Sequence, residues 1–142
     1  MENDQPNVLQ AVPFFMVADM EASLRFYTEG LGFEIKNTWT PRGKIEWCWL
    51  QLGEASLMLQ QHSSNKYGDA IKGTGISVCF TCRDAIKLYH EFNQRGIAAT
   101  EPFVGNGLWV TCITDPDGYK FDFNSETDVP EETKYSDWRK NS

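Results

Sequence analysis

The sequence lacks a long apolar run and an excess of basic residues. Its longest apolar stretch, Ala11–Ala18, is far too short to cross a bilayer, and residues 1–10 are too polar for a signal peptide. With 13 Lys and Arg against 20 Asp and Glu, the formal charge of −7 argues against a surface for nucleic acid or anionic lipid. We therefore expect a cytoplasmic protein without nucleic-acid or membrane partners, whose ligand is a neutral or cationic small molecule.

Histidine is also scarce, which limits the chemistry that the chain supports. Neither of its two histidines has an evident Cys or Ser partner, and no Gly-x-Ser-x-Gly motif is present, so nucleophilic catalysis finds no support. The four cysteines are expected to be reduced thiols. Cys79 and Cys82 are three residues apart, and on a strand such residues point to opposite faces, so they are badly placed to share a metal ion.

What the sequence does contain is an internal repeat. Asp19 and Asp84 stand at equivalent places 65 residues apart (84 − 19), each before a helical pattern that ends at glycine. Leu57–Gln60 is matched 64 residues later (121 − 57) by Phe121–Asn124. A nearly constant offset indicates one supersecondary unit used twice, so a site formed between the copies should draw on equivalent positions of both.

Each copy has the pattern of one strand, one helix with an aspartate N-cap, and three further strands. The expected strands are Val12–Val17, Phe33–Thr38, Ile45–Leu52 and Ala55–Gln61 in the first copy, and Ile76–Cys82, Ile97–Pro102, Leu108–Thr114 and Lys120–Asn124 in the second. Asp115–Gly118 is a strong reverse-turn signal between the last two strands. The predicted fold class is α+β, with two βαβββ modules that form curled mixed sheets around a cavity.

The length of 142 residues suits one domain made of two such modules. The predicted divisions are a lead-in over 1–10, a single domain over 11–125 (module one 11–62, connection 63–75, module two 76–125) and a tail over 126–142. Tyr135 and Trp138 are more apolar than a solvated tail needs, so we expect them to dock on a partner subunit.

Three motifs give the chain a resemblance to a known family. They are the aspartate-capped helix that ends in Tyr27, the Gly32-Phe33 pair after it, and the Asp115–Tyr119 turn before an apolar strand. The chain resembles the vicinal-oxygen-chelate superfamily, which includes glyoxalase I, bleomycin-resistance proteins and extradiol dioxygenases. The resemblance covers Val12 to Ser125, and it implies a cavity enclosed by the paired modules and commonly completed in a homodimer.

In metal-dependent members of that superfamily, the first and last strands of each module each supply one metal ligand. The resemblance places these four positions at Val12, Met58, Ser77 and Asp122. Catalytic sites for hard or borderline dications normally have three protein ligands that are carboxylates, imidazoles or similar donors, and here only Asp122 qualifies. We therefore expect no metal ion and no cofactor.

An alternative stays open if the register of the last strand in the first module is different. Gln60 and His62 lie on the same face of that strand as Met58, and His62 with Asp122 and a carboxylate of a second subunit would make an unusual metal site. The chain would then be a metal-dependent lyase, isomerase or dioxygenase. The sequence leaves open whether the chain is an enzyme. A further alternative is an accessory subunit in which the fold serves association only.

The predicted cavity lining is apolar and aromatic with a few polar points, as is typical of small-molecule pockets. The candidate ligand-binding residues are Phe14, Trp47, Trp49, Met58, Gln60, Trp109 and Asp122. Tryptophans at a cavity mouth stack on planar or cationic ligands, although any single one more often fills a core.

The metal-free bleomycin-resistance proteins are acidic dimers that sequester a cationic aromatic drug, and this chain resembles them in charge and aromatic content. The predicted function is therefore metal-independent sequestration of a planar apolar or cationic ligand, with antibiotic resistance as one use of such binding. A homodimer is the expected assembly.

Overall fold

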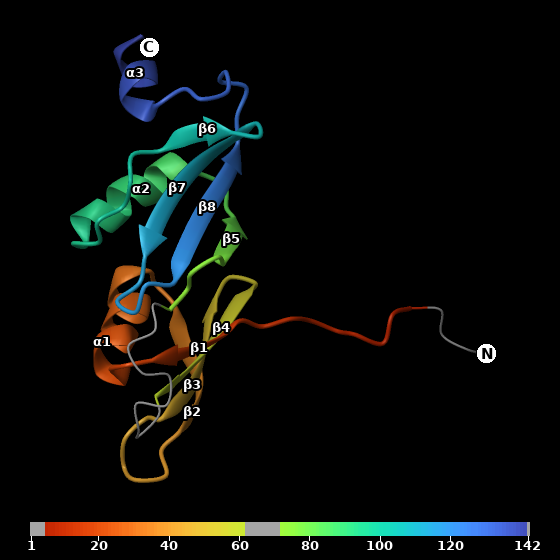
Figure 1. Ribbon diagram of the computed structural model, residues 1–142, viewed down its shortest axis with the longest axis vertical. Coiled ribbons are helices and arrows are strands. Elements are labelled where there is room, and N and C mark those ends of the chain that lie inside the picture. The colour runs from red at the N-terminus through yellow and green to blue at the C-terminus, as the bar shows by residue number, and fades with distance from the viewer. Residues whose placement is uncertain (1–4, 62–71, 142) are drawn as a thin grey trace.

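Two successive modules, each made of a four-stranded sheet and a helical segment, form the body of the protein (Figure 1). The computed structural model describes residues 5–61 and 72–141. The first module contains β1 (Phe14–Val17), α1 (Met20–Leu24), the π-helical segment η1 (Arg25–Gly30), β2 (Glu34–Trp39), β3 (Trp47–Leu52) and β4 (Ala55–Gln61). The second contains β5 (Ser77–Thr81), α2 (Ala85–Gln94), β6 (Phe103–Gly105), β7 (Leu108–Thr114) and β8 (Lys120–Glu126), and α3 (Tyr135–Lys140) follows it.

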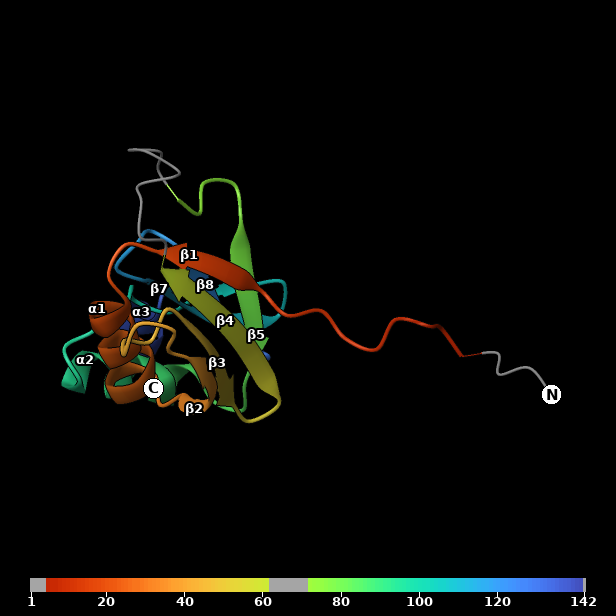
Figure 2. The ribbon, with the colours of Figure 1, turned by 90° about the horizontal axis from the view of Figure 1, so that it is seen from below.

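The two sheets have the same topology. Their strand orders are β1-β4-β3-β2 and β5-β8-β7-β6, and in each the outer first strand runs parallel to the last strand while the other neighbours are antiparallel. The predicted fold class, α+β with two βαβββ modules of mixed sheets, is confirmed. The segment of residues 5–13 runs away from this body before β1 begins (Figures 1 and 2).

Both predicted aspartate caps are present. The Asp19 carboxylate accepts from the Ala22 amide at 3.2 Å, and the Asp84 carboxylate accepts from the Lys87 amide at 2.9 Å, which satisfies amides that have no partner in the first helical turn. The first helix widens into the π-helical segment η1. In its second half, the Thr28 hydroxyl donates to the Leu24 carbonyl at 2.6 Å.

Both helices lie on one side of the two sheets and leave the other side open, as Figure 2 shows. Alternation along each strand sends one set of side chains into the core beneath the helices. In β4, for example, Leu57 and Leu59 are fully buried while Met58 between them is only half-buried. The same core contains Tyr27, which is inaccessible to solvent, and Phe121 from the second module.

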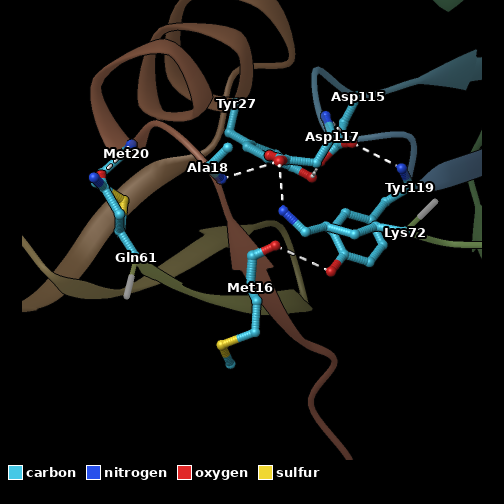
Figure 3. Close-up of polar contacts among 9 residues, drawn as sticks. All are labelled: Met16, Ala18, Met20, Tyr27, Gln61, Lys72, Asp115, Asp117 and Tyr119. Carbon is cyan, nitrogen blue, oxygen red and sulfur yellow. Dashed lines mark hydrogen bonds and ion pairs between the residues drawn. The ribbon is translucent and has the colours of Figure 1, made fainter. Parts of the chain in front are cut away.

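Polar contacts join the two modules where β1 meets the turn before β8 (Figure 3). The Tyr27 hydroxyl donates to the Asp115 carboxylate at 2.7 Å across 88 residues of sequence. Asp117 accepts from the Ala18 amide at 3.0 Å and pairs with Lys72 at 3.2 Å, and the Phe15 and Tyr119 rings stack at 4.1 Å. These contacts fix the sheets one beyond the other along the long axis, so their open faces do not oppose each other within one chain.

The structure corrects one predicted strand. No strand forms over Ile97–Pro102, and the corresponding strand is the short β6 that follows. Pro102 has no amide to donate, and Thr100 makes only one backbone bond to β7, from its amide to the Cys112 carbonyl at 3.0 Å.

The tail contains the helix α3. Tyr135 and Trp138, expected to dock on a partner subunit, lie against Trp109 of the same chain, with ring centroids 6.2 and 5.5 Å away. Backbone bonds from Val104 to residues 132 and 133 cover the outer edge of β6. Within the described residues, no helix has the length and apolar character needed to cross a membrane.

Candidate functional site

The open side of the first sheet gathers most of the predicted ligand-binding residues. Its side chains form two rows across β1, β4 and β3: Phe14, Met58 and Trp49 in one row, and Met16, Gln60 and Trp47 in the next. We call these six residues the aromatic face. Phe14 is 45% exposed and Trp47 and Trp49 are half-buried, so two indoles, a phenyl ring and two thioethers remain accessible on one surface.

The open side of the second sheet is its structural counterpart and has different chemistry. Its rows across β5, β8 and β7 are Cys79, Asp122 and Cys112, and then Thr81, Asn124 and Val110. We call these six residues the polar face. Asp122 is the equivalent of Met58, and the repeat thus places a carboxylate where the aromatic face has a thioether. It also places thiols where the aromatic face has Phe14 and Trp49.

Trp109 does not belong to either open face. It is 5% exposed and lies on the helix side of β7, beneath Tyr135 and Trp138. The prediction that it shares a cavity mouth with Trp47 and Trp49 is therefore wrong in placement.

Trp109 lies on the other face because the connection between paired residues is one residue longer from β7 to β8 than from β3 to β4. Trp49 pairs with Met58 and Cys112 pairs with Asp122, so equivalent residues of β3 and β7 are 63 apart, whereas those of β4 and β8 are 64 apart. A shift of one residue moves every side chain to the opposite face of a strand. Cys112 is the residue that sequence reasoning missed, and counting back from the Asp115–Gly118 turn would have found it.

Two hollows in the described part of the chain lie away from both faces. One of about 440 Å³ lies between the start of α1 and the β2–β3 loop, and one of about 610 Å³ lies between α2 and α3. Neither is lined by a residue of the aromatic or polar face. Neither of these two hollows is therefore formed by the aromatic face or the polar face.

The four positions that correspond to metal ligands in the superfamily differ in their donor chemistry. In the parallel pairing of β1 with β4, Met58 lies opposite Phe14 and its amide donates to the Pro13 carbonyl at 2.9 Å, while Val12 precedes β1. Of Val12, Met58, Ser77 and Asp122, only the last offers a donor suited to a hard dication. Across residues 5–61 and 72–141, no three His, Cys, Asp or Glu side chains are grouped so as to hold a metal ion.

The displaced site proposed around His62 lies outside the described residues, so the structure does not describe that alternative. Gln60 is on the aromatic face, two residues before it. The donors that the structure does describe at the four positions do not fit a catalytic dication.

The Cys112 thiol of the polar face is held in its protonated form. Burial raises the pKa of the Cys112 thiol to about 11, and the neighbouring Asp122 carboxylate adds to that rise. The Cys79 sulfur lies 3.9 Å from the other side of the same carboxylate. All four cysteines are free, and Cys79 and Cys112 are separated by the whole width of β8, too far for a disulfide between them.

Comparison with known proteins identifies the family. The model of the Glyoxalase/Bleomycin resistance protein/Dioxygenase superfamily matches residues 9–123. Lactoylglutathione lyase of Arabidopsis thaliana is 26% identical over 124 residues, which are 82% of this chain and 44% of the relative. The chain thus spans less than half the length of that relative.

Solved structures of similar fold include proteins that bind antibiotics. A bleomycin-binding protein complexed with bleomycin has a TM-score of 0.65 and 23% identity, over 84% of this chain and 99% of the other. An antibiotic-binding protein from Streptomyces sp. CB03234 has a TM-score of 0.63 and 20% identity, over 84% and 98%. These likenesses concern the fold, and with the match to residues 9–123 they place the chain in the glyoxalase/bleomycin resistance protein/dioxygenase superfamily.

Proposed function

We propose that this protein is a metal-independent binding protein that sequesters a planar apolar or cationic small molecule. The observation that carries the proposal is the aromatic face, on which Trp47, Trp49 and Phe14 remain accessible beside one another. Indole and phenyl rings held by strands stack on planar ligands with little loss of conformational freedom. The antibiotic-binding proteins of the same fold support this class of function.

We also propose that the working unit is a homodimer in which the aromatic face of each chain opposes the polar face of the other. The sheets lie one beyond the other along the long axis, so their open faces do not oppose each other within one chain. A twofold arrangement that opposed polar face to polar face would bring the two copies of Asp122 together, and like charges at short distance repel. Opposing aromatic and polar faces avoids this repulsion and creates two equivalent sites.

A metal-dependent lyase is the second candidate, and the similarity to lactoylglutathione lyase favours it. The donor set opposes it, because Val12, Met58 and Ser77 stand where metal ligands would be required. A dication held by Asp122 alone would exchange with water, and the Lewis-acid chemistry of such enzymes needs a tightly held ion.

Titration of tryptophan fluorescence tests the binding proposal. Acridine, which is planar and neutral near pH 7.5, and metal-free bleomycin serve as probes. We expect saturable quenching by at least one of them, and a loss of affinity of about tenfold in Trp47→Ala or Trp49→Ala, because buried aromatic anchors dominate such sites. Trp138→Ala is the matched control, since it removes an indole from the helix side and leaves the affinity unchanged.

Absence of saturable binding by both probes would overturn the proposal. Equal losses in Trp47→Ala and Trp138→Ala would also count against it, because they would indicate a general loss of structure. Far-ultraviolet circular dichroism of each variant separates unfolding from a local effect.

A further inference from the structure

The turn between β6 and β7 contains the one Asn-Gly pair of the sequence, Asn106-Gly107. Gly105 pairs with Leu108 across the turn, and the φ angles of Asn106 and Gly107 are +56° and +73°. Two-residue hairpin turns with both φ angles positive favour Asn-Gly, so the turn alone explains why these residue types stand here. The same pair is also chemically reactive, because glycine has no side chain to shield its own amide nitrogen.

Asparagine is a labile residue, and deamidation of such a pair needs neither enzyme nor cofactor. The Gly107 amide loses its proton to base, and its nitrogen forms a bond to Cγ of Asn106. The bond from Cγ to the side-chain nitrogen breaks, and ammonia leaves. Water then opens the resulting succinimide and gives aspartate or isoaspartate. Both residues are exposed, and a hollow of about 410 Å³ beside them opens the turn to water.

In the folded chain the attacking nitrogen is engaged in a hydrogen bond. The Gly107 amide donates to the Glu131 carboxylate at 2.9 Å, and the Gly107 carbonyl accepts from the Thr127 amide at 3.0 Å. A carboxylate that accepts from an amide disfavours loss of the amide proton, because the anion formed would lie beside a negative charge. The bond to Glu131 therefore works against deamidation of Asn106.

Glu131 belongs to the tail that follows β8 and runs along the outer edge of β6 (Figure 1). Val104 of β6 exchanges backbone bonds of 2.8 and 2.9 Å with residues 132 and 133 of this tail. Farther along the tail, α3 covers Trp109. Release of the tail from β6 would therefore free the Gly107 amide and uncover Trp109 at the same time.

The product of deamidation adds a negative charge to an acidic part of the surface. Asn106 shares its hollow with Glu126 and Asp128, and Glu131 is bonded to the next residue. Like charges at short distance repel, so a carboxylate at position 106 opposes the return of Glu131 to the turn. The modification thus acts in the same direction as the event that permits it.

We propose that Asn106-Gly107 is a deamidation site that Glu131 of the tail protects, and that its product favours release of the tail from β6. Because the lost ammonia does not return, a transient release of the tail becomes a lasting change of the protein. The site lies away from the aromatic and polar faces, so this inference does not depend on the proposed function.

Peptide mapping of the full chain tests the protection. After incubation in mildly alkaline buffer, mass spectrometry measures the deamidated fraction of the peptide that contains Asn106. We expect Glu131→Ala to deamidate about tenfold faster than the wild-type chain, because a hydrogen bond to a charged group is lost. Asp128→Ala is the matched control, since it removes the same charge beside the same turn and keeps Glu131, and its rate should stay within about twofold of wild type.

Urea provides the reference state for this comparison. It removes the contact of the tail with the turn from all three proteins, so they should then deamidate at equal rates. Equal rates of wild type and Glu131→Ala in buffer, or equal acceleration by Asp128→Ala, would overturn the protection by Glu131. A difference that persists in urea would overturn it as well. Failure of Asn106 to deamidate in Glu131→Ala would overturn the site itself.

Trypsin cleavage after Lys134 tests the consequence for the tail. Lys134 is bridged to Phe103 while the tail lies on β6, so faster cleavage there reports release. Asn106→Asp installs the charge directly and should be cleaved about threefold faster than wild type. Asn106→Gly keeps the positive φ without the charge and should be cleaved at the wild-type rate. An unchanged rate in Asn106→Asp, or the same increase in Asn106→Gly, would overturn the proposed effect of the product.

Discussion

Replacing Tyr27 by phenylalanine removes the hydroxyl that joins the two modules and little else. The Tyr27 side chain is inaccessible to solvent, and its hydroxyl donates to Asp115 at 2.7 Å. Burial and the neighbouring Asp115 carboxylate raise the pKa of Tyr27, so the hydroxyl keeps its proton. Asp115 would retain two amide donors, from Asp117 at 2.9 Å and Tyr119 at 2.8 Å.

Losing a hydrogen bond to a buried charged group costs about 2 kcal/mol. We therefore expect Tyr27→Phe to lower the free energy of unfolding by about 2 kcal/mol near pH 7.5, measured by urea denaturation with an unchanged m-value. The corresponding fall in Tm is roughly 6 °C for a chain of this size. Tyr89→Phe is the matched control, because the Tyr89 hydroxyl has no hydrogen bond to the described residues, and it should cost less than about 0.5 kcal/mol.

The pH dependence of this loss follows from Asp115. Burial raises the pKa of Asp115 above its ordinary value of 3.8, and the hydrogen bond from Tyr27 is the largest influence in the opposite direction. A raised pKa in the folded state means that stability is highest below pH 3.8 and falls as the pH rises through the window up to the folded pKa. Without the hydroxyl the folded pKa rises further, so the deficit of Tyr27→Phe should grow with pH.

Near pH 3, which is below the ordinary value of 3.8 and therefore below the raised pKa of the folded state, Asp115 is protonated in both proteins, and the deficit should shrink to that of a neutral hydrogen bond, about 1 kcal/mol. Urea denaturation at the two pH values gives this comparison directly. A deficit below about 0.5 kcal/mol near pH 7.5, or one that is equal at both pH values, would refute the reasoning.

Two further predictions concern Asp115 at the same junction and the glycines of the segment before β5. In Asp115→Asn the side-chain oxygen still accepts from the amides of Asp117 and Tyr119, and the new side-chain amide donates to the Tyr27 oxygen. Because this side chain no longer titrates, the fall in the free energy of unfolding above pH 3.8 that Asp115 causes should disappear in urea denaturation. An unchanged dependence of that free energy on pH would contradict this. Gly73→Ala should cost about 3 kcal/mol, since its φ is +77° and its Cβ would lie 2.6 Å from the Gly118 carbonyl oxygen. Gly75→Ala has a similar φ of +81° with nothing within 4 Å, so it should cost only about 1–2 kcal/mol, and equal thermal shifts for the two variants would show that the close approach is unimportant.

Local signals in the sequence were enough to predict the architecture. The caps at Asp19 and Asp84 act through neighbouring amides, and the turn at Asp115–Gly118 acts through its own backbone, so each is readable from a few residues. Strands β4 and β7 have the predicted bounds. The repeat then fixed their order, because equivalent segments of one chain adopt equivalent structure.

The contacts that position the candidate site were not visible at that level. The bond between Tyr27 and Asp115 spans 88 residues, and no local pattern indicates it. The face on which Trp109 lies depends on the number of residues in a turn, which alternation alone does not give. That the faces are open follows from how the two modules meet, which depends on packing along their shared edge.

The account depends most on binding without a metal ion. Protein purified without chelator should contain less than stoichiometric Zn, Ni, Mn or Fe by elemental analysis, and its affinity for acridine and for metal-free bleomycin should be the same before and after dialysis against excess EDTA. A stoichiometric ion in the purified protein, together with loss of binding once EDTA has removed it, would contradict the account.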